Sequence, residues 1–304
     1  MRNEITEGGV SWIDIHSPAQ EDVEYLTERF QFHPVATQEL LSPSWRTKAE
    51  RFDGHLFLVF YFPVHNKERR ETRAREIDFI VSKNAIVTAH YNSIVPLKGM
   101  FDRCNMYEAE RQKFFEQGTG MMLFEILEEL GKSCLVKLNR IGKKMEAIES
   151  DIFRGKERAM LQELLLVKTD IIDFYRIVVS QQKTFESLRR IAPEFFGQEH
   201  EPYYSHLAGT WEQATSDLQT YKDTVLALEQ TNVALLSSKT SEVLKVLTLF
   251  SVIIFPLTLF ATLFTMDTVS KPLRGYPGDF WIIIAIMGLV AFGMHRYFKK
   301  KHWI

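Results

Sequence analysis

Apolar and polar residues follow a strand-like pattern in three stretches near the start of the chain. Residues 9–15 (GVSWIDI) mix the two kinds in near alternation, and residues 55–64 (HLFLVFYFPV) are almost wholly apolar. Residues 77–91 contain two further apolar runs, separated at Lys83 and Asn84. Because β-branched and aromatic residues dominate these runs, the pattern predicts β-strands, and 77–91 predicts a hairpin.

One helix and one loop are predicted among these strands. Ser17 and Pro18 predict the N-cap and first position of a helix, Gln20 predicts its capping-box glutamine, and the helix should end near Phe30. Residues 65–76 (HNKERRETRARE) carry many charges of both signs, which favours a solvated loop over a nucleic-acid surface. No nucleic-acid partner is therefore expected.

From about residue 95 the pattern becomes helical and stays helical. Apolar residues recur at intervals of three and four in 121–153 and again in 157–191. This spacing predicts two long amphipathic helices. Only Arg154 and Gly155 interrupt the pattern between them, so the two helices are expected to be antiparallel neighbours.

A third helix carries the chain into an apolar region. Proline and glycine break the pattern in 192–202, and nothing breaks it again until Pro256. A single helix from about 203 to 266 would be about 90 Å long. Residues Val246 to Met266 contain no charge and can cross a hydrocarbon core of about 30 Å, and 280–294 form a second apolar run. The sequence predicts a membrane protein with two spans.

Basic residues predict the orientation of these spans. Arg296 and the lysines at 299–301 follow the second span, whereas the linker between the spans carries only Lys271 and Arg274. Because basic residues favour the cytoplasmic side, both termini are expected in the cytoplasm, with the chain in an inner or plasma membrane. The first residues have no apolar segment typical of a signal peptide.

Overall composition changes this picture little. The chain has 304 residues, 45% of them hydrophobic and 25% charged, with a net charge of −2. Cys104 and Cys134 are the only cysteines, which indicates a reducing compartment and no disulfide framework. The sequence contains no Walker A loop, no HxxxH or HxH pair and no GxSxG. We therefore expect neither an enzyme nor a covalently bound cofactor.

The first span carries small polar residues on one face. The steps from Thr248 to Ser251, Thr258 and Thr262 are three, seven and four residues, which is one stripe of an α-helix. The residues on or beside the stripe are Ser241, Leu244, Leu247, Thr248, Ser251, Phe255, Thr258 and Thr262. Two explanations fit. The hydroxyls can bond back to carbonyls four residues earlier, at a helix contact, or the stripe can line a pore.

Asp267 ends the apolar run and favours the pore. A monomer with two spans cannot enclose a channel, but several copies around an axis would bring their Asp267 carboxylates into a ring at its mouth. Acidic rings attract cations and are a known selectivity device.

At these residues the chain resembles the CorA family of divalent-cation channels. The similarity is carried by SEVLKVLTLFSVIIFPLTLFATLFTMD, by GYP in the linker and by the terminal YFKKKHWI, and more loosely by FHPVATQELLSPSWRTKAERFDGHLFLVF upstream. It implies an α+β cytosolic domain, with an α/β/α N-terminal part and long helices, and a stalk helix that continues into two transmembrane helices. It also implies a funnel-shaped homopentamer in which the first spans line the pore.

The resemblance also implies roles for individual residues. The family signature Gly-Met-Asn stands here as Thr265, Met266 and Asp267, which would form the selectivity filter, with Asp267 as the metal-binding position. The resemblance implies a pore lining of Thr258, Phe255, Leu247, Leu244 and Ser241 below the filter, and the polar stripe adds Ser251 and Thr248. His206 lies about where the family has a regulatory aspartate. Imidazole would suit zinc, nickel or cobalt better than magnesium, unless His206 is a plain surface residue.

Pattern and resemblance together divide the chain into seven parts. These are a cytosolic α/β domain (1–95), long antiparallel helices (96–202), a stalk (203–242), the pore-lining span (243–267), an outer loop (268–279), the second span (280–298) and a basic tail (299–304).

The expected function is a pentameric channel for divalent cations. Magnesium is the default substrate, with cobalt, nickel or zinc possible. Two alternatives remain: a proton-coupled zinc or divalent transporter of the same superfamily, and a non-conducting membrane scaffold with a lost filter. The partners expected are further copies of the chain and the lipid bilayer.

Overall fold

The computed structural model describes residues 1–66, 71–266 and 278–301. The chain forms two compact units, Met1–Gln230 and Thr231–Ile304. The strands are β1 (Arg2–Glu7), β2 (Val10–His16), β3 (Lys48–Phe52), β4 (His55–Asn66), β5 (Glu71–Ser82) and β6 (Ala85–His90). The helices are α1 (Gln20–Phe30), α2 (Pro34–Glu39), α3 (Val95–Met106), α4 (Glu108–Glu116), α5 (Gly118–Phe153), α6 (Glu157–Phe196), α7 (Glu201–Thr265) and α8 (Asp279–Lys300), with a 3-10 turn at Gln198–His200.

The six strands form one mixed sheet in the order β1-β2-β6-β5-β4-β3. Only β2 and β6 run parallel, and the other neighbours are antiparallel. Gly8 and Gly9 have φ values of 56° and 82°, which allow the tight turn that joins β1 to β2. The predicted hairpin at Lys83 and Asn84 is confirmed as the β5–β6 connection.

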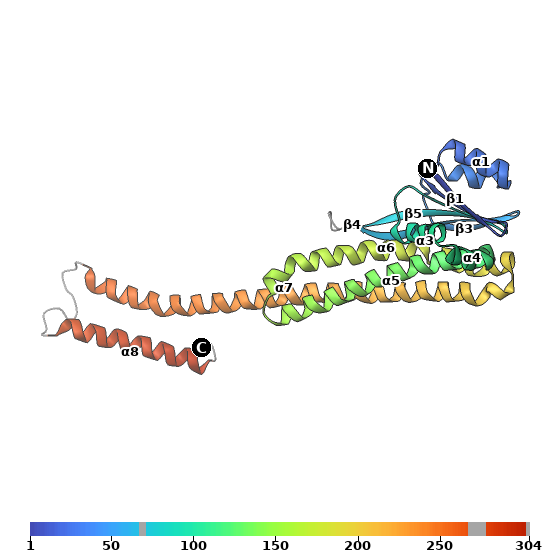
Figure 1. Cartoon of the computed structure of the whole chain (residues 1–304). Helices are drawn as coiled ribbons and strands as arrows, with labels where there is room; N and C mark the ends of the chain where they lie inside the picture. The colour runs from blue at the N-terminus through green and yellow to red at the C-terminus, as the bar shows by residue number, and fades with distance from the viewer. Residues whose placement is uncertain (67–70, 267–277, 302–304) are drawn as a thin grey trace. The chain divides into compact units, whose positions relative to one another are not determined.

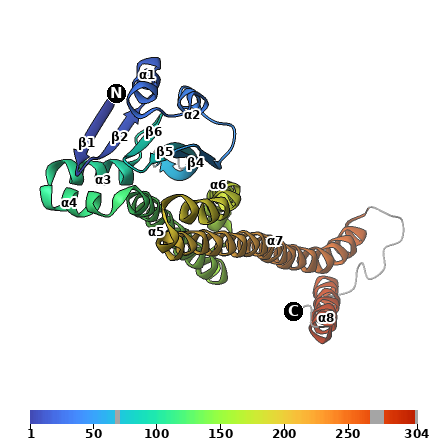
Figure 2. The same cartoon turned by 90° about the vertical axis from the view of Figure 1, so that its right-hand side faces the viewer.

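Helices cover both faces of the sheet (Figures 1 and 2). Along β4 the side chains alternate: Phe57 and Val59 belong to a core with residues of α1 and α2, whereas Phe60 and its neighbours on that side join a core with α3 to α7. This period of two is what a strand buried on both faces requires. The expected α/β/α arrangement of the N-terminal part is thereby confirmed.

Aromatic side chains join the sheet to the long helices. The ring of Phe185 on α6 lies 4.7 Å from that of Phe60 on β4 and 4.7 Å from that of Trp211 on α7. The Phe62 ring lies 5.8 Å from Trp211. Because aromatic pairs at these separations contribute beyond their buried area, this cluster fixes where α6 and the first part of α7 lie on the sheet.

Three boundaries differ from the sequence prediction. Residues 65–66 and 71–76, expected in a loop, belong to β4 and β5, because the antiparallel ladder continues as far as Asn66 opposite Glu71. The charges in 71–76 hid the start of β5, in which successive side chains point to opposite faces of the sheet. Residues 67–70 lie outside the described part of the chain.

The first helix starts later than predicted, at Gln20. Ser17 has a φ of 53°, so its backbone cannot serve as the expected N-cap, and Ala19 takes that position. The capping box is made by Asp22, whose carboxylate accepts the Ala19 N–H at 3.0 Å, and not by Gln20.

Helix α6 continues through Pro193 to Phe196, past the predicted break. Its end is instead set by Gly197, which has a φ of 129° and donates its N–H to the Pro193 carbonyl at 3.1 Å. The two long antiparallel helices are otherwise confirmed, as is the third, which runs from Glu201 to Thr265 with Pro256 inside it.

Gly120 offers a test of this packing. A Cβ at Gly120 would lie 2.6 Å from His200 Nε2 and 2.9 Å from the Phe196 ring, whereas one at Gly99 would meet only Arg103, at 3.8 Å. We expect Gly120→Ala to lower the free energy of unfolding by about 1–3 kcal/mol through overpacking. The matched Gly99→Ala should raise it by up to about 1 kcal/mol, since alanine favours a helix interior. Thermal unfolding of the full chain measures both, and equal shifts would contradict this account.

Candidate functional site: one face of helix α7

The second compact unit contains the apolar part of α7. Among the described residues, two helices are long and apolar enough to cross a membrane: the one that ends at Thr265 and the one from Phe280 to Lys300. Large side chains such as Phe255 (71% exposed) and Leu247 (60% exposed) are uncovered in the single chain. Contiguous exposed apolar surface of this kind needs lipid or another protein surface to cover it.

The hydroxyls of the stripe bond within their own helix. Ser251 Oγ donates to the Leu247 carbonyl at 2.9 Å, and Thr258 Oγ1 donates to the Ile254 carbonyl at 3.0 Å. Thr262 bonds to a carbonyl three residues earlier, at 2.8 Å. The back-bonding explanation from the sequence is therefore confirmed for Ser251 and Thr258. It does not exclude a pore, because each oxygen keeps lone pairs that can accept hydrogen bonds from water.

Three apolar residues lie on the same face of α7 as these hydroxyls. Leu244, Leu247 and Phe255 are 56%, 60% and 71% exposed, and the spacing of the helix puts them between the polar positions. Ser241 and Thr248 are also exposed and lie on this face. The face therefore alternates apolar bulk with hydrogen-bond acceptors along the helix axis.

Pro256 interrupts the backbone ladder beside Phe255. Proline has no N–H, so the carbonyl of Val252 receives no bond from the residue four positions later. In a hydrocarbon environment such a carbonyl needs another partner, and water in a polar groove can supply it.

The predicted filter lies at the end of α7. Thr265 is the last helical residue, and its Oγ1 donates to the Thr262 carbonyl at 2.8 Å. Met266 follows and is 54% exposed, with its N–H donated to Thr262 at 3.2 Å. Asp267 lies outside the described residues, together with the linker as far as residue 277.

His206 belongs to the first compact unit, whereas the face of α7 described above belongs to the second. His206 is exposed on α7, and its carbonyl accepts a hydrogen bond from Thr210 Oγ1 at 2.9 Å. Within residues 1–66, 71–266 and 278–301, no group of three or more His, Cys, Asp and Glu side chains is arranged to hold a metal ion.

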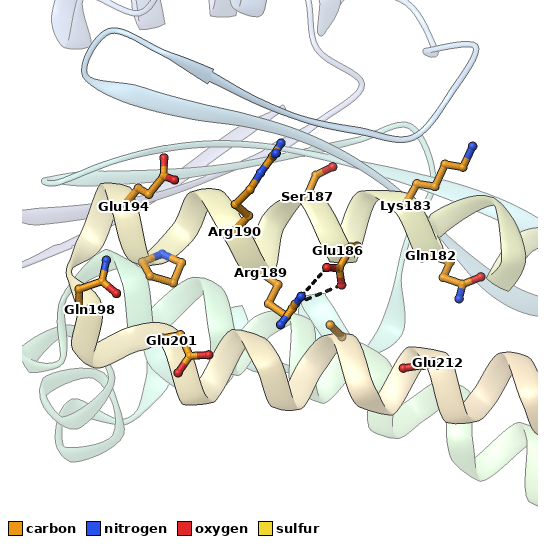
Figure 3. Close-up of a pocket in the computed structure, with 12 residues that line it drawn as sticks. Gln182, Lys183, Glu186, Ser187, Arg189, Arg190, Glu194, Gln198, Glu201 and Glu212 are labelled. Atoms are coloured by element: carbon orange, nitrogen blue, oxygen red, sulfur yellow. Dashed lines mark hydrogen bonds and ion pairs between the residues drawn. The ribbon is translucent and has the colours of Figure 1, made fainter.

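A groove lies in the first unit, between α6 and the start of α7 (Figure 3). This groove has a volume of about 1000 Å³ and carries both signs of charge. Its charged residues are Lys183, Glu186, Arg189, Arg190, Glu194, Glu201 and Glu212. Arg189 Nε donates to Glu186 at 3.1 Å, and this bond lowers the pKa of the Glu186 carboxyl. The groove shows no preference for one sign of ligand, so the face of α7 is the stronger candidate site.

Comparison with known proteins assigns the chain to a family. The family model described as "CorA-like Mg2+ transporter protein" matches residues 7–300. The chain belongs to this family. The family is one of transporters, so the expectations of CorA membership and of a protein that is not an enzyme are confirmed.

Individual relatives agree with this assignment. The cobalt/magnesium transport protein CorA of Thermotoga maritima is 24% identical over 296 residues, covering 97% of this chain and 83% of the relative. The putative metal ion transporter YfjQ of Bacillus subtilis is 21% identical and covers 96% of this chain and 89% of its own. The CorA magnesium transporter structure from Methanocaldococcus jannaschii superposes with a TM-score of 0.82 at 19% identity, over 99% of this chain and 94% of that one. The expected α+β fold with a long helix and two candidate transmembrane helices is confirmed.

Cysteine substitution tests which face of α7 meets water. We expect a charged thiol reagent to modify Thr258→Cys about tenfold faster than Leu257→Cys, because reaction requires a hydrated thiolate. Position 257 is turned about 100° from position 258 around a helix of 3.6 residues per turn. The native chain gives little background, since burial raises the pKa of Cys104 to about 11 and that of Cys134 to about 12. Equal rates at 257 and 258 would contradict the assignment of the face.

Proposed function

We propose that this chain forms a homopentameric channel that conducts divalent cations through a pore lined by the hydroxyl-bearing face of α7. Membership of the CorA-like family supports transport of a divalent cation, with magnesium as the default. The observation that carries the proposal is a charge-free span whose polar atoms all lie on one face and which leads to Asp267. Thr265 and Met266 complete the proposed filter.

The hydroxyl oxygens suit a hydrated ion. Magnesium gives up its water reluctantly and is usually recognised through its hydration shell. With their hydrogens donated to backbone carbonyls, Ser251 and Thr258 present acceptor lone pairs to that shell. Five copies of Thr258 would give a ring of acceptors, and Thr248 and Ser241 would repeat it toward the cytoplasmic end.

The apolar residues of the same face suit a gate. Rings of Leu244, Leu247 and Phe255 would form narrow hydrophobic layers, which close by losing their water column. The acceptor rings and apolar layers thus alternate along one path.

The outer end decides selectivity. A ring of Asp267 carboxylates attracts any cation strongly, whereas the asparagine of the family signature offers a neutral carbonyl. We infer that this variant discriminates by charge more than by the geometry of the hydration shell, so cobalt, nickel and zinc should also pass. Both termini and the first compact unit lie in the cytoplasm in this proposal, and His206 is a candidate for regulation by zinc, nickel or cobalt rather than by magnesium.

Ion uptake into proteoliposomes tests the ring. We expect Asp267→Asn to raise the concentration of divalent cation needed for half-maximal uptake by about tenfold, because five negative charges at the mouth are lost together. Asp279→Asn is the matched control, since it also removes one carboxylate per chain, but at the first residue of α8 and outside the proposed filter. Magnesium, cobalt, nickel, zinc and sodium are compared, with and without a pH gradient.

Other outcomes separate the alternatives. Equal effects of the two substitutions would contradict the ring and leave only general surface charge. Uptake that requires a proton gradient would replace the channel with a proton-coupled transporter. Absence of uptake from folded pentamers would mean a scaffold that keeps the architecture without transport.

A further inference from the structure

Strand β5 places two acidic side chains on the face of the sheet that α1 and α2 cover. Ile77 and Phe79 belong to the core beneath the long helices, and Ile80 belongs to the opposite core. Glu76 and Asp78 therefore share the face of Ile80, two residues apart on one strand. Asp78 is 1% exposed and Glu76 is 8% exposed, so both carboxyl groups are withdrawn from water.

The two carboxyl groups differ in their partners. The Ser44 N–H donates to Glu76 Oε1 at 2.8 Å. In the described part of the chain, Asp78 receives no hydrogen bond from a backbone N–H, a hydroxyl or a cation, and the group that interacts with it most directly is the Glu76 carboxyl. Asp14, on β2, provides a contrast: Thr88 Oγ1 donates to it at 2.6 Å, and His90 lies 3.3 Å away. A buried carboxylate without such donors is strongly disfavoured.

The groups that surround the pair give Asp78 little compensation. Glu39 of α2, Lys48 of β3, Tyr61 of β4 and Tyr91 after β6 all act on the pair electrostatically. Lys48 is the one cation among these four, and it forms ion pairs with Glu39 and Glu50.

Both tyrosine hydroxyls are already engaged. Tyr91 donates to the Leu40 carbonyl at 2.8 Å, and Tyr61 donates to the Ser44 carbonyl. Burial raises the pKa of Tyr61 to about 12 and raises that of Tyr91 further, so neither hydroxyl ionises near neutral pH. The two hydroxyls therefore hold the segment 40–48 by hydrogen bonds to its carbonyls, and neither donates to Asp78.

Burial, and then the nearby charge of Glu76, raise the pKa of Asp78 well above its usual range. Burial also raises the pKa of Glu76, but the bond from the Ser44 N–H opposes this shift. The Ser44 N–H favours the ionised form of Glu76, and Asp78 lacks such a donor, so Asp78 is the member of the pair better suited to hold a proton.

We propose that Glu76 and Asp78 form a buried proton-binding pair, and that release of the proton from Asp78 opens the segment 40–48 above it. This segment is held at one side by the pair through Ser44 and at the other by α6, where Thr47 Oγ1 donates to the Ser180 carbonyl at 2.8 Å and accepts from Thr184 at 2.9 Å. The device makes the α2–β3 region sensitive to cytoplasmic pH, separately from the conduction path.

The sign of the effect follows from linkage. The closed state holds a proton that the open, hydrated state releases, so closure is fully supported below the ordinary aspartate pKa of about 3.9. The stabilisation is lost as pH rises from that value through the raised pKa of the closed state. Alkaline pH therefore favours opening.

Hydrogen–deuterium exchange of the full chain in detergent, from about pH 5 to pH 9, tests the proposal. After correction for intrinsic exchange, peptides covering 40–48 should open up to about tenfold more per pH unit, because one proton is released on opening. Asp78→Asn should abolish this dependence, since its side chain cannot ionise. Asp53→Asn, an exposed carboxylate at the β3–β4 turn, should behave as the native chain does.

Two further measurements test the proposal even if Asp78→Asn fails to fold. Glu76→Gln keeps Asp78 but removes the charge that helps to raise its pKa, so the increase in opening with pH should end at a lower pH and be smaller in total than in the native chain. Infrared spectra of the native chain near pH 7 should contain the C=O band of a buried carboxylic acid, and Asp78→Asn should lack it. Absence of the band, retention of the pH dependence in Asp78→Asn, or opening governed by added MgCl₂ instead of pH would each overturn the proposal.

Discussion

Helix α7 depends on one constraint: every polar group that enters a hydrocarbon layer must find a hydrogen-bond partner, either inside the helix or in water held by a polar groove. The donation from Ser251 and Thr258 to backbone carbonyls satisfies that constraint and permits hydroxyls in a charge-free span. The same bonds orient the oxygens as acceptors, which is the chemistry that a hydrated cation needs. Hydrogen bonds from these hydroxyls to the helix backbone are thus compatible with a pore lining. The back-bonding and pore interpretations of the sequence do not exclude each other.

Buried polar groups in the first compact unit also need partners. Among its described residues, single atoms such as His55 Nδ1 and Trp211 Nε1 lack one, whereas at Asp78 both carboxyl oxygens lack an N–H, hydroxyl or cation donor. Beyond the end of β3, the open edge of β4 is satisfied by a helix: Gln181 on α6 is fully buried, and its side-chain oxygen accepts the Tyr61 N–H at 3.1 Å. Asp14 obtains donors from Thr88 and a neighbour in His90. Asp78 has neither, and a proton is the smallest partner that can make such a carboxyl group tolerable in a core.

The sequence predicted the long helices well and the sheet less completely, for a physical reason. Helical periodicity extends over tens of residues in 121–153 and 157–191, so a few misleading residues do not hide it. Residues 61–66 of β4 pair with the charged residues 71–76 of β5. A charged sequence such as 71–76 is typical of a loop, and only its pairing with β4 identifies it as a strand. That misassignment also concealed Glu76, whose position opposite Tyr61 becomes visible only through the register of the strands.

The spacing of polar residues in the sequence identifies a candidate pore face on α7, but it does not show which side of the helix faces a pore axis. In one chain Leu244 and Phe255 are exposed, and so is Phe250 on another side of the helix, because nothing covers either side. In the proposed channel, further copies of the chain would define the pore axis. What the single chain does supply is one helix, α7, which runs from Glu201 to Thr265 with Pro256 inside it. Bending of α7 costs the least free energy at Pro256, because one backbone hydrogen bond is already missing there. In the proposed pore, a bend at Pro256 would change the orientation of Thr258 relative to Leu244 and Leu247.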